Sequence, residues 1–224
     1  MYRSRYLLIL LLLVSGQVIL NAQGHDLKIG LRGGYNAAFG GFAAASIETN
    51  QIICKDFSIN GGIQYNTIGR TALEARPTYS LNFNKGSISP EILMSYTNLA
   101  SVNSFAAGAG LGAEFGSVSA RFGWYYRVFG GHGSWIKENF NIYYDFHVHL
   151  LRKIEDWKLD LTITNNEIFE HDRHFQPTFL AECFHYPSER IGISFGIGCK
   201  PAGMFNMSAD NYQTCIKTGV CYRW

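Results

Sequence analysis

Apolar and polar side chains alternate along most of the chain after residue 23, with a repeat of two. In the clearest segment, 139–150, every second side chain is apolar and the side chains between them are mostly polar. Alternate side chains of a β-strand point to opposite faces, so this pattern predicts strands with one oily and one wet face. The oily face of this segment consists of Phe140, Ile142, Tyr144, Phe146, Val148 and Leu150.

The same alternation recurs along the chain and predicts about twelve strands. Two segments, 38–49 and 178–186, fit it poorly because apolar side chains fall on both faces, and losing one ambiguous hairpin would leave ten strands. The helical spacing i, i+3, i+4 is not sustained anywhere after residue 23, which favours an all-β chain. The clear segments are 27–35, 57–65, 118–128, 157–163, 191–197 and 212–224.

These expected strands have the length that a tilted strand needs to cross a bilayer, about 9 to 11 residues. A closed antiparallel barrel pairs its backbone N–H and C=O groups without help from water. Only 16% of the residues are charged, against roughly 25% in ordinary soluble domains. We therefore predict an all-β, antiparallel transmembrane β-barrel over residues 23–224. The alternative is a soluble secreted β-sandwich with the aromatic side chains in its core.

The first 22 residues have the three parts of a secretory signal peptide. Arg3 and Arg5 give a positive start, 6–14 is apolar, and Ala22 is the small residue that a signal peptidase requires. The apolar run is much shorter than the roughly 20 residues of a membrane-spanning helix. Since the first cysteine is Cys54, attachment of a lipid to the mature N-terminus is not expected.

The connections between the expected strands fall into two classes. An even strand number leaves both termini in the periplasm, with short periplasmic turns and longer loops on the outside. Counted from the N-terminus, the even connections are short, whereas the later odd connections are longer and richer in glycine, histidine and asparagine. The three long connections, which we expect to face outward, are 130–138, 166–177 and 200–211.

The last expected strand carries Val220, Tyr222 and Trp224 on one face. This alternation ending in an aromatic residue resembles the C-terminal strand signature of bacterial outer-membrane β-barrel proteins. The resemblance is one of architecture and covers the mature chain. It implies a location in the outer membrane, contact with outer-membrane lipid, and insertion by the barrel-assembly machinery.

Charge and cysteine content narrow the choice of function. Removal of Arg3 and Arg5 lowers the basic count from 19 to 17, equal to the 17 acidic residues. Without a basic excess, nucleic-acid binding is excluded. The five cysteines lack the CxxC spacing of a zinc site and are best explained as small apolar residues. No cofactor or metal is expected.

The wet faces of the expected strands supply the candidate lumen residues. Asp145, His147 and His149 stand at i, i+2 and i+4 and project in one direction. Such a trio could bind a divalent ion or act as a base and its orienting group, but a wet lumen requires polar residues in any case. The sequence places no nucleophile beside it, so no catalytic residue is assigned. Arg121 and Arg127 are further lumen candidates.

The connection 166–177 supplies the candidate binding residues of the outer surface: His171, Asp172 and His174. The leading hypothesis for function is a small pore, a transport accessory or a structural component of the outer membrane, with a small solute passing through the wet lumen. The first alternative is a surface binding or adhesion barrel that holds its ligand with the outer loops. The second is an outer-membrane lipid hydrolase.

Overall fold

The computed structural model describes residues 25–37, 40–99, 102–131, 134–154, 156–165, 177–203 and 208–224. These residues form β-strands joined by turns, and none of them belongs to a helix long and apolar enough to cross a membrane. The predicted signal peptide, 1–22, lies outside the described residues. The strands are β1 (His25–Asn36), β2 (Gly40–Cys54), β3 (Phe57–Asn66), β4 (Arg70–Tyr79), β5 (Leu81–Phe83), β6 (Gly86–Leu99), β7 (Val102–Phe115), β8 (Val118–Gly131), β9 (Ser134–Ile154), β10 (Trp157–Thr164), β11 (Thr178–His185), β12 (Ile191–Gly203) and β13 (Ser208–Arg223).

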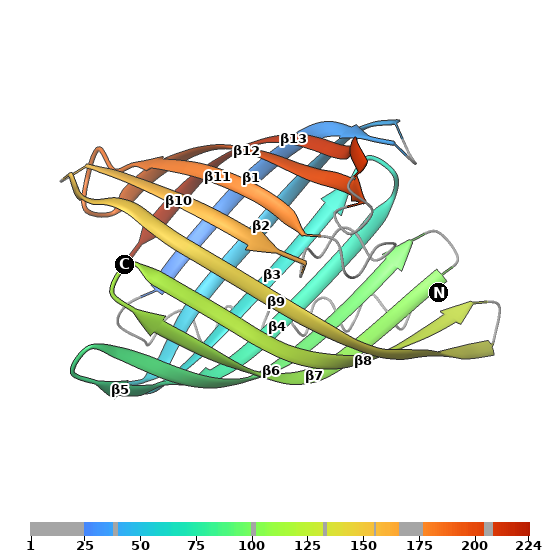
Figure 1. Ribbon diagram of the computed structural model, residues 1–224, viewed down its shortest axis with the longest axis horizontal. Helices are drawn as coiled ribbons and strands as arrows, with labels where there is room; N and C mark the ends of the chain where they lie inside the picture. Colours follow the sequence, from blue (N-terminus) through green and yellow to red (C-terminus); the bar gives the residue numbers. More distant parts are fainter. Residues whose placement is uncertain are drawn as a thin grey trace.

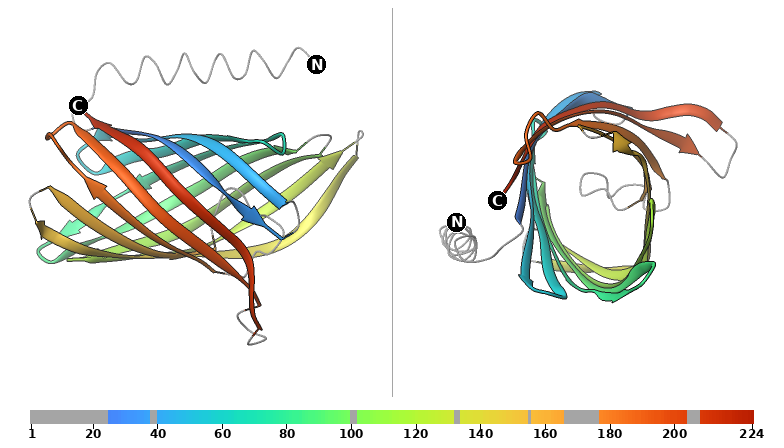
Figure 2. Two further views of the ribbon diagram at one scale, coloured as in Figure 1. Left: turned by 90° about the horizontal axis from the view of Figure 1, so that it is seen from above. Right: turned by 90° about the vertical axis from the view of Figure 1, so that its left-hand side faces the viewer.

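The strands form one antiparallel sheet that closes on itself (Figure 1). Strands that follow one another along the chain are paired, except that β4 pairs with β6 in place of β5, and β1 pairs with β13. The three-residue β5 continues β4 beyond Ser80 and also pairs with β6, so the wall has twelve strands, as predicted. The two segments with an ambiguous pattern, 38–49 and 178–186, do contain strands: residues 40–49 belong to β2 and residues 178–185 to β11. Figure 2 shows the strands encircling a common axis, steeply inclined to it.

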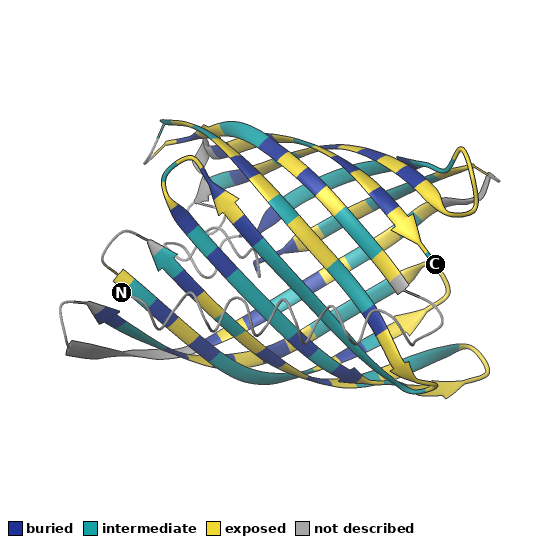
Figure 3. Ribbon diagram, turned by 180° about the vertical axis from the view of Figure 1, so that it is seen from behind, coloured by how far each residue is buried: buried dark blue, intermediate teal, exposed yellow. Residues whose placement is uncertain are grey.

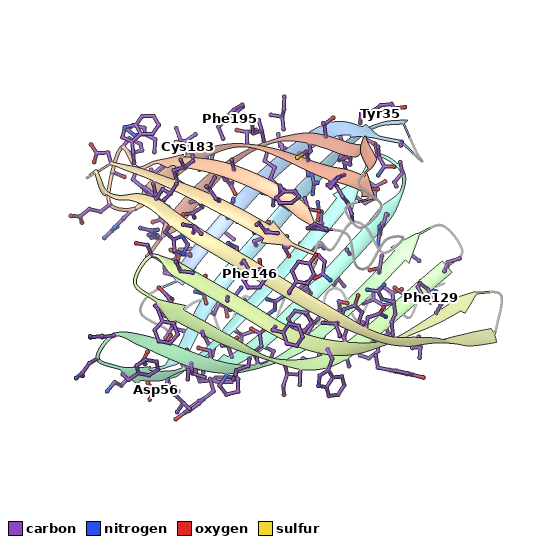
Figure 4. All side chains as sticks on the ribbon, in the orientation of Figure 1. Tyr35, Asp56, Phe129, Phe146, Cys183 and Phe195 are labelled. Atoms are coloured by element: carbon purple, nitrogen blue, oxygen red, sulfur yellow. The ribbon has the colours of Figure 1, made fainter. Side chains whose placement is uncertain are left out.

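The short connections predicted from the sequence lie together at the end of the barrel where β13 ends, which we call the terminal end. Lys55 and Asp56 join β2 to β3 there, and Gly116 makes the β7–β8 turn with a φ of 59°, a conformation that favours glycine. Figure 4 places Asp56 at this end and Tyr35 at the opposite end, which we call the loop end. That the loop end faces the cell exterior stays a prediction.

Two of the long connections are shorter than predicted. The β8–β9 ladder continues to the pair Gly131–Ser134, and the β12–β13 ladder to Gly203–Ser208. Most of 130–138 and 200–211 is therefore strand, and β12 and β13 extend beyond their neighbours (Figure 2). The prediction was wrong because ladder hydrogen bonds are made by the backbone, so strands at a rim tolerate residues that are typical of loops.

Side-chain exposure alternates along the strands, with apolar groups on the outside (Figure 3). On β12, Phe195 is 56% exposed and Ile197 58% exposed. Ser194, which precedes Phe195 and points to the other face, is 1% exposed. Outward aromatic residues occur towards both ends of the wall, as in the aromatic girdles of membrane barrels. A soluble sandwich would bury the outward residues in a core. The closed wall with its apolar outer surface confirms the predicted transmembrane barrel fold.

A charge on the outer surface should lower the stability of the barrel in the membrane. Phe195 points away from the barrel (Figure 4) and lies near the middle of β12. We expect Phe195→Arg to lower the free energy of unfolding in lipid vesicles by about 2–4 kcal/mol, the cost of an arginine at the bilayer midplane. The measurement is a urea titration followed by the heat-dependent gel shift of folded barrels.

Phe195→Leu is the matched control, because it keeps the position apolar and should change the unfolding midpoint little. Equal stability of the arginine and leucine variants would show that this face does not contact hydrocarbon.

Candidate functional site: the charged lumen

A group of ionisable side chains lines the inner wall about halfway along the strands from β4 to β9. We call this group the charge belt, and the sequence places each member on the inward face of its strand. β7 contributes glycines at 108, 110 and 112 in place of charges. The belt consists of Glu74 and Arg76 on β4, Glu91 on β6, Arg121 on β8, and Asp145 and His147 on β9.

Glu91 is the centre of the belt, and its side chain is fully buried. Its Oε1 lies 3.8 Å from Nη1 of Arg76, and its Oε2 lies 3.6 Å from Nε of Arg121. Arg76 also bonds Glu74 at 2.7 Å, and Arg121 reaches Oδ2 of Asp145 at 3.5 Å. A buried carboxylate is costly unless opposite charges and hydrogen bonds surround it, and the two guanidinium groups supply that compensation.

Tyr143 completes the surroundings of Glu91 and was missed by the sequence analysis. Its hydroxyl donates a 2.7 Å hydrogen bond to Oε1 of Glu91. To reach β6 from β9, the side chain must cross β8 and β7, and it does so over Gly123 and Gly110. A Cβ at Gly123 would lie 2.6 Å from Cε1 of Tyr143, and one at Gly110 would overlap its hydroxyl. The glycines at 110 and 123 therefore leave the space that the Tyr143 ring occupies.

The opposite part of the wall carries a second set of pairs. On β10, Asp160 accepts from Lys158 at 2.6 Å and contacts Nδ1 of His149 at 2.7 Å. Lys28 on β1 pairs with Glu182 on β11 at 2.5 Å. The ammonium groups of Lys28 and Lys158 also lie 4.9 and 5.3 Å from the ring centroid of Phe184, within the range of cation–π attraction.

The predicted trio Asp145, His147 and His149 does share the inner face of β9, but the two histidines bond different carboxylates. His147 contacts Oδ1 of Asp145 through Nε2 at 2.9 Å, whereas His149 faces Asp160. The two rings are stacked, with centroids 6.2 Å apart. Among the residues that the structure describes, no three His, Cys, Asp or Glu side chains gather into a metal site.

His147 also contacts the hydroxyl of Thr162 on β10, at 2.9 Å from Nδ1. Hydroxyl, imidazole and carboxylate thus stand in the order of a nucleophile, its base and the group that orients the base. An acyl-transfer site further needs N–H donors aimed at the developing oxyanion. Thr162 is paired in register with His147 on one side and with Leu180 on the other. The backbone N–H groups near its hydroxyl therefore belong to the ladders of the sheet and are not directed at an oxyanion. The arrangement fits a structural hydrogen bond better than a catalytic site.

The remaining candidates lie apart from the belt. Arg127 is six residues closer to the loop end than Arg121 on the same strand and is 3% exposed. Its guanidinium packs 4.9 Å from the ring centroid of Tyr125. The outer-surface candidates His171, Asp172 and His174 lie outside the described residues.

The ion pairs described above follow the wall of the barrel. Most join groups on one strand or on adjacent strands. Arg121–Glu91 passes over β7, which carries glycine at the crossing, and Lys28–Glu182 passes over β12 and β13. These ion pairs therefore lie against the inner surface of the wall. They do not tie opposite sides of the barrel together.

The fit of Tyr143 over its glycines gives a stability prediction. Gly110→Ala should lower the free energy of unfolding by about 1–3 kcal/mol, because the added methyl group overlaps the tyrosine hydroxyl. In a Tyr143→Ala background the same substitution should cost less, and the remaining effect comes from the Phe122 carbonyl oxygen, which would lie 2.9 Å from the added Cβ. A double-mutant cycle in vesicles measures the coupling, and equal effects in the two backgrounds would show that tyrosine and glycine do not interact.

No family model matches the chain, and no curated protein matches its sequence. Among solved structures, the KdgM porin superposes with a TM-score of 0.57 at 11% identity, covering 89% of this chain and 99% of that one. KdgM porin in complex with disordered oligogalacturonate gives 0.55 at 12%, covering 90% and 99%. Outer membrane protein Omp33 of Acinetobacter baumannii gives 0.47 at 7%, covering 91% and 100%. The two KdgM superpositions show that the chain has the fold of the bacterial outer-membrane β-barrel porins.

Proposed function

We propose that this protein is a narrow pore through which small polar solutes cross the bacterial outer membrane. The observation that carries the proposal is the charge belt, in which ionised side chains are held against the wall of a closed twelve-strand barrel. The pore is integral to the membrane and performs no catalysis.

The width of the barrel supports a pore. Side chains can fill a barrel of about eight strands, whereas wider barrels leave space for water or a ligand. Here the inner face carries arginine, glutamate, aspartate and lysine side chains halfway through the membrane. Ionised groups at that depth are strongly favoured by a water-filled space on one side of them. The similarity in fold to a porin agrees with this proposal.

The charge belt would form the narrow part of the pore. Its largest partly exposed member is Arg121, whose side chain is 38% exposed and therefore projects towards the axis. Glu91 and Arg76 lie closer to the wall, at 0% and 7%. Arg121 thus controls how much of the cross-section remains open at this level.

Shortening Arg121 should widen the pore. We expect Arg121→Ala to raise the single-channel conductance by roughly 1.5- to 3-fold in planar bilayers, because a long side chain leaves the lumen. Phe122→Ala is the control: its neighbour in sequence points outward and is 59% exposed, so conductance should not change.

The pore proposal is rejected if the wild-type protein, folded according to its heat-dependent gel shift, gives no conductance steps. Equal conductance of Arg121→Ala and wild type would place the narrow part elsewhere.

A further inference from the structure

We infer that the charge belt binds small zwitterions, such as free amino acids, with the solute carboxylate on Arg121 and the solute ammonium on Asp145. This inference rests on the proposed pore and adds the class of its solute. Its basis is the Arg121–Asp145 pair, in which the two groups are partly open to the lumen and contact each other only loosely.

The short contacts of the charge belt lie against the wall. Arg76 bonds Glu74 at 2.7 Å, and their side chains are 7% and 14% exposed. The hydroxyl of Tyr143 bonds Glu91 at 2.7 Å, and both of these side chains are buried. Because these groups already satisfy one another, they leave little hydrogen-bonding capacity to a solute in the lumen.

Arg121 differs from these groups in exposure and in bonding. Its side chain is 38% exposed. Its two ion pairs are long, 3.6 Å from Nε to Oε2 of Glu91 and 3.5 Å from Nη1 to Oδ2 of Asp145. Charge-assisted N–H···O bonds are usually about 2.7–2.9 Å long. The guanidinium is therefore held between the two carboxylates by charge, and it retains donors for a further acceptor.

Glu91 gives independent evidence that this guanidinium is not fully engaged. Its Oε2, the atom that faces Arg121, is buried and has no hydrogen-bond partner among the described residues. A shift of the guanidinium by roughly 0.7 Å would bring Nε to the usual hydrogen-bond distance of about 2.9 Å. Both Nη atoms would then be left to a solute carboxylate, in the two-pronged geometry that arginine favours.

Asp145 supplies an acceptor beside these donors. It is paired in register with Arg121 across β8 and β9, and its side chain is 11% exposed. Its Oδ1 contacts Nε2 of His147 at 2.9 Å, which holds the carboxylate in place. The contact described for Oδ2 is the long one to Arg121, so Oδ2 has capacity for an ammonium group. Donor and acceptor thus stand side by side on the inner wall.

The pair matches a solute that carries both charges close together. In an amino acid one carbon atom joins the ammonium to the carboxylate, so these groups are about as close as the two groups of the pair. Aligned antiparallel to the pair, the solute exchanges one 3.5 Å contact for two short charge-assisted contacts. A carboxylate alone would meet Asp145 and Glu91 as like charges, and an ammonium alone would meet Arg121.

The test is the block of ion current through single channels in planar bilayers at about 0.1 M KCl and neutral pH, since higher salt would screen the pair. L-alanine at millimolar concentration should reduce the current by roughly half, because the bound solute leaves less of the lumen to ions. Propionate lacks the ammonium and ethylamine lacks the carboxylate. Each should need at least about tenfold more for the same block, since one charge-assisted contact is lost.

Matched variants assign the block to the pair. Arg121→Met keeps a long side chain without donors, and Asp145→Asn keeps the shape without the charge. Each should raise the L-alanine concentration for half-block by roughly tenfold or more. Arg223→Met removes the same group from the exposed ion pair with Asp26 at the terminal end and should leave the block unchanged. Block is expressed relative to the conductance of each variant, and folding is checked by the heat-dependent gel shift.

The outcomes separate this inference from the pore proposal. Absence of conductance in the folded wild type would reject the pore itself. Conductance that propionate or ethylamine blocks as strongly as L-alanine would overturn the zwitterion assignment while leaving the pore in place. Block by L-alanine that survives unchanged in the folded Arg121→Met and Asp145→Asn variants would overturn the assignment to the pair.

A binding measurement tests the pair without reference to conductance. Saturation-transfer NMR on the folded protein in detergent should show binding of L-alanine to the wild type and to Arg223→Met, and a much weaker signal with Arg121→Met. Equal signals from all three proteins, or none from the wild type, would reject the binding site.

Discussion

The structure depends on the pairing of backbone N–H and C=O groups where water is absent. Hydrocarbon offers no partner to an open sheet edge, so a sheet within it must close. Closure is achieved here by the ladder between the first and last strands, β1 and β13, whereas the other ladders, including β4–β6, join strands that follow one another along the wall. Once the ring is closed, the repeat of two sends alternate side chains to lipid and to the lumen. The apolar outer surface and the charged inner surface both follow from this closure.

The lumen shows how charged groups are accommodated inside such a wall. Glu91 is buried because two guanidinium groups and a phenol surround it. Arg76 lies on the adjacent strand β4, whereas Arg121 and Tyr143 reach Glu91 over glycine-bearing positions of β7 and β8. The absence of side chains at Gly110 and Gly123 is thus as important to the charge belt as the ionisable groups. The pairs lie along the wall, so the interactions that satisfy these charges join neighbouring parts of the inner surface.

Much of the architecture could be predicted from the sequence, because it depends on local alternation. The number of strands, the outward set of β12 and the shared face of Asp145, His147 and His149 all follow from the repeat of two. The partners of those residues could not be predicted. Asp160 and Thr162 meet the histidines through the register of β9 with β10, and Glu182 meets Lys28 across two intervening strands. The repeat within one strand carries no information on these contacts. Tyr143 falls among the polar residues of its segment, so its pattern indicated a wet face and not a packing role.

The position of Tyr143 has a mechanical consequence. One rigid ring lies over two strands and is bonded to a third, so β6, β7, β8 and β9 are braced against bending relative to one another. In the contacts described above, the remaining wall, with the short strands β10 and β11, has no rigid ring in such a position, and its Lys28–Glu182 pair across β12 and β13 is made by flexible side chains. When the lateral pressure of the bilayer changes, deformation should concentrate in β10 and β11, and the bore beside β6–β9 should keep its shape.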